Sequence, residues 1–139
     1  MLDTDHTDAK IYHPTIALFG RIMFTLIFFL SGITHFTGVG QYAALMPVVI
    51  PFRPFWVILS GATELIGAML VVTNRYPRLG AWIIVLFLVP VTITVHGTAM
   101  LTAADETMRQ MQLSFFLKGI TMTGAALLIT QLGVSRADR

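Results

Sequence analysis

The stretch LGAWIIVLFLVPVTITVHGTAML, residues 79–101, contains no Asp, Glu, Lys or Arg, and it decides the fold. About 20 apolar residues, each rising about 1.5 Å along a helix, are enough to cross the hydrocarbon core of a bilayer. Residues 15–36, 55–73 and 111–132 form three further stretches of similar character. Strands are excluded because a lipid-exposed strand leaves its backbone polar groups unpaired. The sequence therefore predicts an all-α integral membrane protein, an antiparallel bundle of four transmembrane helices.

The composition of the 139-residue chain narrows the possible functions. Hydrophobic residues make up 55% and charged residues 12%, which excludes an ordinary soluble domain. The net charge of +2 is too small for the dense basic patch that nucleic-acid binding needs, so we expect no nucleic-acid partner. The chain has no cysteine, which excludes disulfides, thiolate metal sites and iron–sulfur ligation. We predict no metal site, and a redox role would need an electron carrier held by another protein.

Four spans place both termini on the same side of the membrane. Five basic residues near the span ends lie on the terminal side and two on the opposite side, which favours cytoplasmic termini in a multi-pass protein. The residues counted are Lys10, Arg75, Arg78, Arg136 and Arg139, against Arg53 and Arg109. The expected organisation is a cytoplasmic tail over residues 1–14, a transmembrane domain over residues 15–132 and a cytoplasmic tail over residues 133–139.

The three connections also carry structural signals. Glycines and prolines between residues 37 and 54 break a long helix but permit a short amphipathic turn at residues 41–46. Residues 74–78 form a tight turn that makes the second and third spans antiparallel neighbours, and Pro77 suits the first turn of a helix. In the third connection, Asp105, Glu106 and Arg109 stand at helical spacing, which predicts a surface helix running into the fourth span.

Five ionisable residues lie inside the predicted spans, where each costs about 2.5 to 3.5 kcal/mol on insertion scales. They are Arg21, His35, Glu64, His96 and Lys118. Glu64 lies roughly 15 Å below the outer end of its span, near the midplane. Lys118 lies about 10 Å deep, so its side chain can bend toward Glu64. All but Arg21 fall in the outer half of the bundle, and we predict a small polar pocket there that opens to the outer side.

The residues next to these ionisable side chains also favour a polar interior of the bundle. Gly61 and Glu64 share one face of the second span, and small residues let helices approach closely while polar groups meet inside. In the third span, Pro90 has no amide hydrogen and therefore frees the carbonyl one turn earlier. Thr92 and His96 follow it on one face, four residues apart.

Each ionisable residue also has a purely structural interpretation. Glu64 and Lys118 can form an ion pair that only fixes the register of the bundle. His96 can bond a neighbouring hydroxyl or carbonyl, and His35 can be a solvated residue at the interface. Arg21 can reach the cytoplasmic phosphates, or contact an acid or a cofactor head group.

An ordered set of motifs resembles the DoxX family of small bacterial membrane proteins. The motifs are the run from Arg21 to Gly32, GATELIG at 61–67, RLGA at 78–81, His96 and FFLK at 115–118. The most specific are the glutamate between small residues and the Phe-x-x-Lys motif. The resemblance implies a four-helix bundle in the bacterial inner (cytoplasmic) membrane. It also implies a link to quinone-dependent sulfur oxidation and to membrane redox complexes.

The leading functional hypothesis is a small inner-membrane subunit or accessory protein of a redox complex, which does not catalyse alone. Glu64, His96 and Lys118 are the expected proton relay, and His35, His96 and Lys118 the expected lining of a quinone pocket. We expect the chain to hold no cofactor of its own other than this quinone.

The alternative is a non-catalytic assembly subunit that packs against a larger membrane protein complex. Four spans around one polar seam leave a large apolar outer surface for contacts between helices. The expected partners are therefore membrane lipids together with either a larger membrane complex or further copies of the chain.

Overall fold

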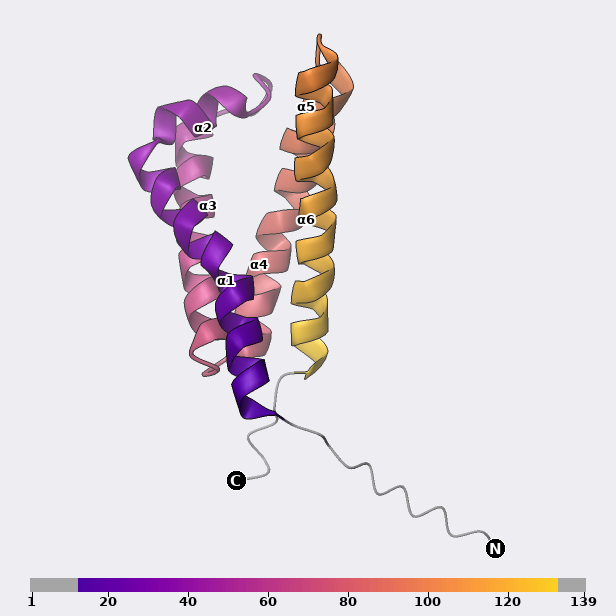
Figure 1. The fold of residues 1–139 in the computed structure, drawn as a ribbon. Coiled ribbons are helices and arrows are strands. Elements are labelled where there is room, and N and C mark those ends of the chain that lie inside the picture. The colour runs from indigo at the N-terminus through magenta and orange to yellow at the C-terminus, as the bar shows by residue number, and fades with distance from the viewer. Residues whose placement is uncertain (1–12, 133–139) are drawn as a thin grey trace, which may run out of the picture.

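The computed structural model describes residues 13–132, and within this range the chain forms helices and no strand (Figure 1). The helices are α1 (Pro14–Thr37), α2 (Val39–Leu45), α3 (Arg53–Val72), α4 (Pro77–Val91), a π-helix η1 (Thr92–Gly97), α5 (Thr98–Thr102) and α6 (Glu106–Leu132). Most of the two predicted tails lies outside the described residues, so their organisation stays a prediction.

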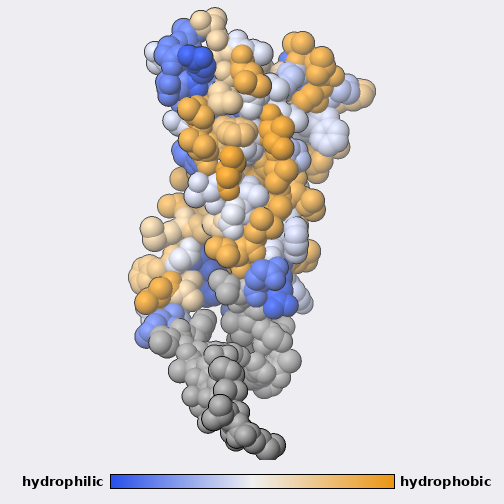
Figure 2. All heavy atoms as spheres, turned by 90° about the vertical axis from the view of Figure 1, so that its right-hand side faces the viewer, coloured by the Kyte–Doolittle hydropathy of each residue, from blue (hydrophilic) through white to orange (hydrophobic). Residues whose placement is uncertain are grey.

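Four segments are long and apolar enough to cross a membrane, which confirms the predicted fold class. They are Pro14–Thr37, Arg53–Val72, Pro77–Thr102 and Glu106–Gln131, and their ends differ from the predicted ends by a few residues. The third span is built from α4, η1 and α5 in succession. Figure 2 shows apolar residues over most of the face that α5 and α6 present, with hydrophilic residues gathered toward its two ends.

The spans pack in an open row. Helix α3 packs against α1 and α4, and α4 packs against α6. The first residues of α1 and the last of α6 lie at the same end of the bundle, here called the proximal end, and α2 and α5 lie at the opposite, distal end (Figure 1). Toward the distal end, α1 and α3 separate from α4 and α6. This separation positions the candidate site.

The hydrophobic core is shared by all four spans. It comprises Phe28, Ala68, Val71, Ala81, Ile84, Val85, Leu88 and Ala126. At the α3–α4 crossing, a Cβ atom added to Gly80 would lie 2.6 Å from the carbonyl oxygen of Gly67. The two helices therefore meet backbone to backbone, a contact that only small residues permit in a membrane.

The connections follow the sequence signals closely. The amphipathic turn is the helix α2, and Pro77 opens α4. The polar residues of the third connection lie at the start of α6 itself: Asp105 Oδ1 accepts a hydrogen bond from the amide of Met108 at 2.9 Å, and Arg109 pairs with Glu106. Asp105 thus caps the helix, which runs from this polar first turn into the fourth span as expected.

The third span changes helix type just after Pro90. Residues Thr92–Gly97 form the π-helix η1, one turn before the distal end of the span. Such π-helical turns inside α-helices are frequent at functional sites. The break in the hydrogen-bond ladder was predicted from the missing proline amide, and the structure shows that the chain absorbs it by widening one turn.

Candidate ligand cavity

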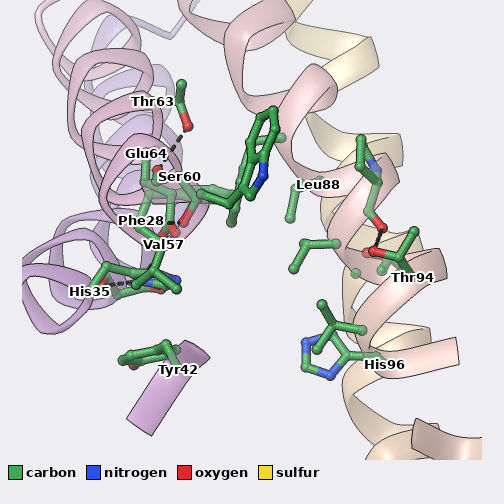
Figure 3. Close-up of a pocket in the computed structure, with 18 of the residues that line it drawn as sticks. Phe28, His35, Tyr42, Val57, Ser60, Thr63, Glu64, Leu88, Thr94 and His96 are labelled. Carbon is green, nitrogen blue, oxygen red and sulfur yellow. Dashed lines mark hydrogen bonds and ion pairs between the residues drawn. The ribbon is translucent and has the colours of Figure 1, made fainter. Parts of the chain in front are cut away.

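A cavity of about 900 Å³ lies where the two helix pairs separate. Its lining includes His35, Glu64, His96 and Lys118, the four residues expected to share a polar pocket. Figure 3 shows His35 and Glu64 on one side and His96 on the other. Arg21, the fifth ionisable residue, is not part of the lining. Its Nε atom is buried and has no hydrogen-bond partner among the described residues.

Glu64 is the one acid among the described residues that line the cavity, and a histidine faces its carboxyl group, with which it forms an ion pair when the imidazole is protonated. Its side chain is 1% exposed, and its Oε1 atom lies 3.5 Å from Nδ1 of His35. The expected ion pair with Lys118 is wrong, because within residues 13–132 Glu64 pairs with His35 alone. The reason is topological: α1 packs directly against α3, whereas Lys118 lies on α6, which packs against α4.

His35 is held by contacts from two helices. Its Nδ1 atom lies 2.7 Å from the carbonyl oxygen of Ser31, which can only accept, so Nδ1 carries the proton and donates. The imidazole stacks on Tyr42 of α2 with ring centroids 4.1 Å apart, and the Tyr42 hydroxyl is hydrogen-bonded to Thr34 at 2.7 Å. His35 is only 8% exposed, so the interpretation as a solvated interface residue is wrong.

A glycine makes the approach of α1 to α3 possible at this level. A Cβ atom added to Gly61 would lie 2.8 Å from Cβ of His35 and 3.0 Å from the carbonyl oxygen of Gly32. The small residue one turn before Glu64 is therefore what lets the imidazole reach the carboxyl group.

The second wall is built by η1 and α6. Nδ1 of His96 lies 3.0 Å from Oε1 of Gln112, a buried amide, and therefore donates to it. Nζ of Lys118 lies 5.3 Å from the centroid of the Phe115 ring, and no described residue forms an ion pair with it. The lysine thus faces the cavity as a cation whose nearest partner is an aromatic face.

Two buried polar atoms on opposite walls have no hydrogen-bond partner among the described residues. They are Oε1 of Glu64 on α3 and Oγ1 of Thr92 on η1, and both residues line the cavity. Thr92 packs against Gly119 of α6 so closely that any side chain there would collide with its hydroxyl. A buried polar atom without a partner is costly, and neither atom is exposed to the space of the cavity.

Three contributing residues were not identified from the sequence. Ser31 and Tyr42 hold His35, and Gln112 holds His96. Ser31 offered a usable signal, because it stands one helical turn before His35 on the same face. Gln112 offered a weaker one, as a polar amide inside an apolar run. Tyr42 offered none, because its contact depends on how α2 folds back over the end of α1.

Comparison with known proteins identifies the family of the chain. No curated protein and no solved structure matches it. The DoxX family model matches residues 16–97, from α1 to the end of η1. The match includes His35, Glu64 and His96, while Lys118 lies beyond it. Because it covers more than half of the sequence, this small multi-pass membrane protein belongs to the DoxX family.

Proposed function

We propose that the protein is a quinone-binding subunit of a membrane redox complex, in which it exchanges protons with the quinone and receives electrons through a partner. One observation carries the proposal. The cavity is large, mostly apolar in its lining, and bears groups that can exchange protons on both of its walls. Its position within the spans suits a ligand that resides in the bilayer.

The residues present fit a quinone. A quinone needs an apolar slot for its ring and hydrogen-bond donors for its carbonyl oxygens. Phe28, Val57 and Leu88 supply buried apolar lining. Lys118 Nζ supplies a donor on the second wall. When bound, a quinone supplies reversible two-electron, two-proton chemistry.

The chain's own residues handle the protons. Glu64 lines the cavity, and its carboxyl group is assigned the exchange of a proton with a bound hydroxyl. His35, 3.5 Å away, stabilises the carboxylate when its imidazole is protonated. On the other wall, His96 is oriented by Gln112 and Lys118 holds a positive charge beside the ligand space. The expected relay of Glu64, His96 and Lys118 therefore gains His35 as a fourth member.

Electrons have to come from elsewhere under this proposal. The sequence contains no cysteine, so no thiolate-bound cluster can lie in this chain. A redox partner in the same membrane complex would supply them, which agrees with a subunit that does not catalyse alone.

The test uses the complex isolated from the native membrane. We expect Glu64→Gln and Lys118→Met each to lower quinone-linked turnover by about 100-fold, the usual loss when a proton-exchanging group is removed. The control is Thr73→Val, because Thr73 is an exposed residue at the end of α3 outside the cavity lining. Each variant is also checked for assembly by its thermal melting in detergent. Unchanged turnover, or equal loss of folding in both variants, would contradict the proposal.

A second candidate, the non-catalytic assembly subunit, is favoured by one face of α6. Ser114, Thr121 and Gly124 are exposed on this helix, and a Cβ atom added to Gly124 would meet nothing within 4 Å. Small residues of this kind let a helix of another protein approach closely. If assembly is the whole function, Gly124→Trp should release the partner while the double change of Glu64 and Lys118 to alanine is tolerated. Co-purification of the partner distinguishes the two cases.

A further inference from the structure

The distal end exposes a strongly apolar segment between α2 and α3. Val48 and Val49 are each 84% exposed and Phe52 is 81% exposed. We refer to residues 45–55, which contain them, as the apolar lip. Fully exposed large apolar side chains that stand together mark a surface that meets lipid or protein rather than water.

The other connection at the distal end has the opposite character. Residues 103–105, between α5 and α6, and the first turn of α6 present exposed Asp105, Glu106 and Arg109, whose polar groups satisfy one another or cap the helix. The connection between α5 and α6 is thus polar and the one between α2 and α3 is apolar, although both lie at the same end of the bundle (Figure 1).

Two carbonyl groups of the lip accept hydrogen bonds from side chains at the start of α3. Irregular backbone next to lipid requires its polar groups to be satisfied. Pro47 and Pro51 carry no amide hydrogen. The carbonyl of Pro51 accepts a hydrogen bond from Trp56 Nε1 at 3.1 Å, and that of Met46 accepts one from Arg53 Nη1 at 3.4 Å. Tryptophan and arginine are also the side chains that anchor proteins at the membrane interface.

The lip is continuous with both the membrane-spanning surface and the cavity. Helix α3 begins at Arg53, so the exposed Phe52 directly precedes a span. Ile50 and Trp56 line the cavity, and so do Leu59 and Leu86, which lie inside spans and are 41% and 71% exposed. The cavity lining therefore merges with side chains that face lipid.

We propose that the apolar lip inserts into the lipid leaflet at the distal end, and that the cavity receives a lipid-soluble ligand sideways from this leaflet. The partner of the lip is lipid at the depth of the head groups and upper acyl chains. The statement about the ligand rests on the proposed function, whereas the insertion of the lip does not. The sideways route differs from the expectation of a pocket that opens to the outer side of the membrane, which stays a prediction.

The absence of cysteine makes a direct test simple. Single-cysteine variants Val49→Cys and Phe52→Cys probe the lip, Leu59→Cys probes the side of the cavity, and Ala104→Cys is the matched control on the polar connection. Each is labelled with a nitroxide and reconstituted into nanodiscs of phosphatidylethanolamine and phosphatidylglycerol. The readout is the relaxation of the label by oxygen, which concentrates in lipid, and by a nickel chelate, which stays in water.

We expect the labels at positions 49, 52 and 59 to be about tenfold less accessible to the nickel chelate than the label at position 104, and more accessible to oxygen. Equal nickel accessibility at 49, 52 and 104 would overturn the insertion of the lip. Nickel accessibility at 59 with protection at 49 and 52 would show an aqueous opening and overturn the sideways route. No quinone is used, so a failed quinone assay and a failed insertion are distinguishable.

Discussion

The proximal and distal halves of the bundle are built from the same four spans, but the helices pack tightly in the proximal half and separate in the distal half. In the proximal half, Gly67 and Gly80 face one another at the crossing of α3 and α4, and an apolar core fills the interior. In the distal half, the helix pairs separate around a carboxyl group, two imidazoles and an ammonium group. The Gly67–Gly80 contact holds α3 and α4 together at the proximal end, whereas toward the distal end the two helix pairs separate (Figure 1).

The largest effect on stability is expected from disrupting the contact between Gly67 and Gly80. Gly80→Leu places a side chain where even a Cβ atom would lie 2.6 Å from the Gly67 carbonyl oxygen and 2.8 Å from Cβ of Leu70. We expect a destabilisation of about 3 kcal/mol or more, the upper range for overpacking. Thermal melting in detergent measures it. Gly20→Leu is the control, because nothing lies within 4 Å of a Cβ atom there, and equal melting of both variants would refute the assigned crossing.

A smaller effect, on turnover rather than on stability, is expected from a substitution in the distal half. His35→Gln removes the imidazole that faces the carboxyl group of Glu64 without changing the contact of α3 with α4. We expect quinone-linked turnover to fall by about 100-fold, with the melting temperature within a few degrees of the original. Turnover and melting are measured on the same preparation. A collapse of folding with proportional loss of turnover would mean that the pair is a structural ion pair.

The smallest effect is expected at the contact that orients the imidazole. Tyr42→Phe keeps the ring stacked on His35 but removes the hydrogen bond between the tyrosine hydroxyl and Thr34. A hydrogen bond of this kind contributes about 0.5 to 1.5 kcal/mol. Tyr42→Ala, which also removes the stacking, should lower turnover more than Tyr42→Phe does. Equal turnover in the two variants would show that α2 does not position His35.

The sequence predicted the spans well because the thickness of the hydrocarbon core fixes their length and composition. It also predicted that His35, Glu64, His96 and Lys118 share one half of the bundle, because depth follows from counting residues along a helix. It failed on the partner of Glu64. Depth does not tell which helix faces which, and the choice between α1 and α6 depends on the packing that Gly61 permits.

The contacts that orient the two histidines could not be predicted from the sequence, for a related reason. Tyr42 reaches His35 only because α2 folds back over the end of α1. The missing amide of Pro90 predicted a break in the hydrogen bonding of the third span, but it did not predict the π-helical turn that follows. Such details depend on local backbone geometry, which residue spacing does not specify.

Photo-crosslinking tests most directly whether the distal cavity binds a quinone. An azido-quinone is added to the isolated membrane complex, activated by light, and its attachment sites are mapped by mass spectrometry. We expect attachment to cavity-lining residues of α3, η1 and α6, with competition by unlabelled quinone and loss of labelling in Glu64→Gln. Labelling confined to lipid-facing residues outside the cavity, or labelling that unlabelled quinone does not displace, would contradict it.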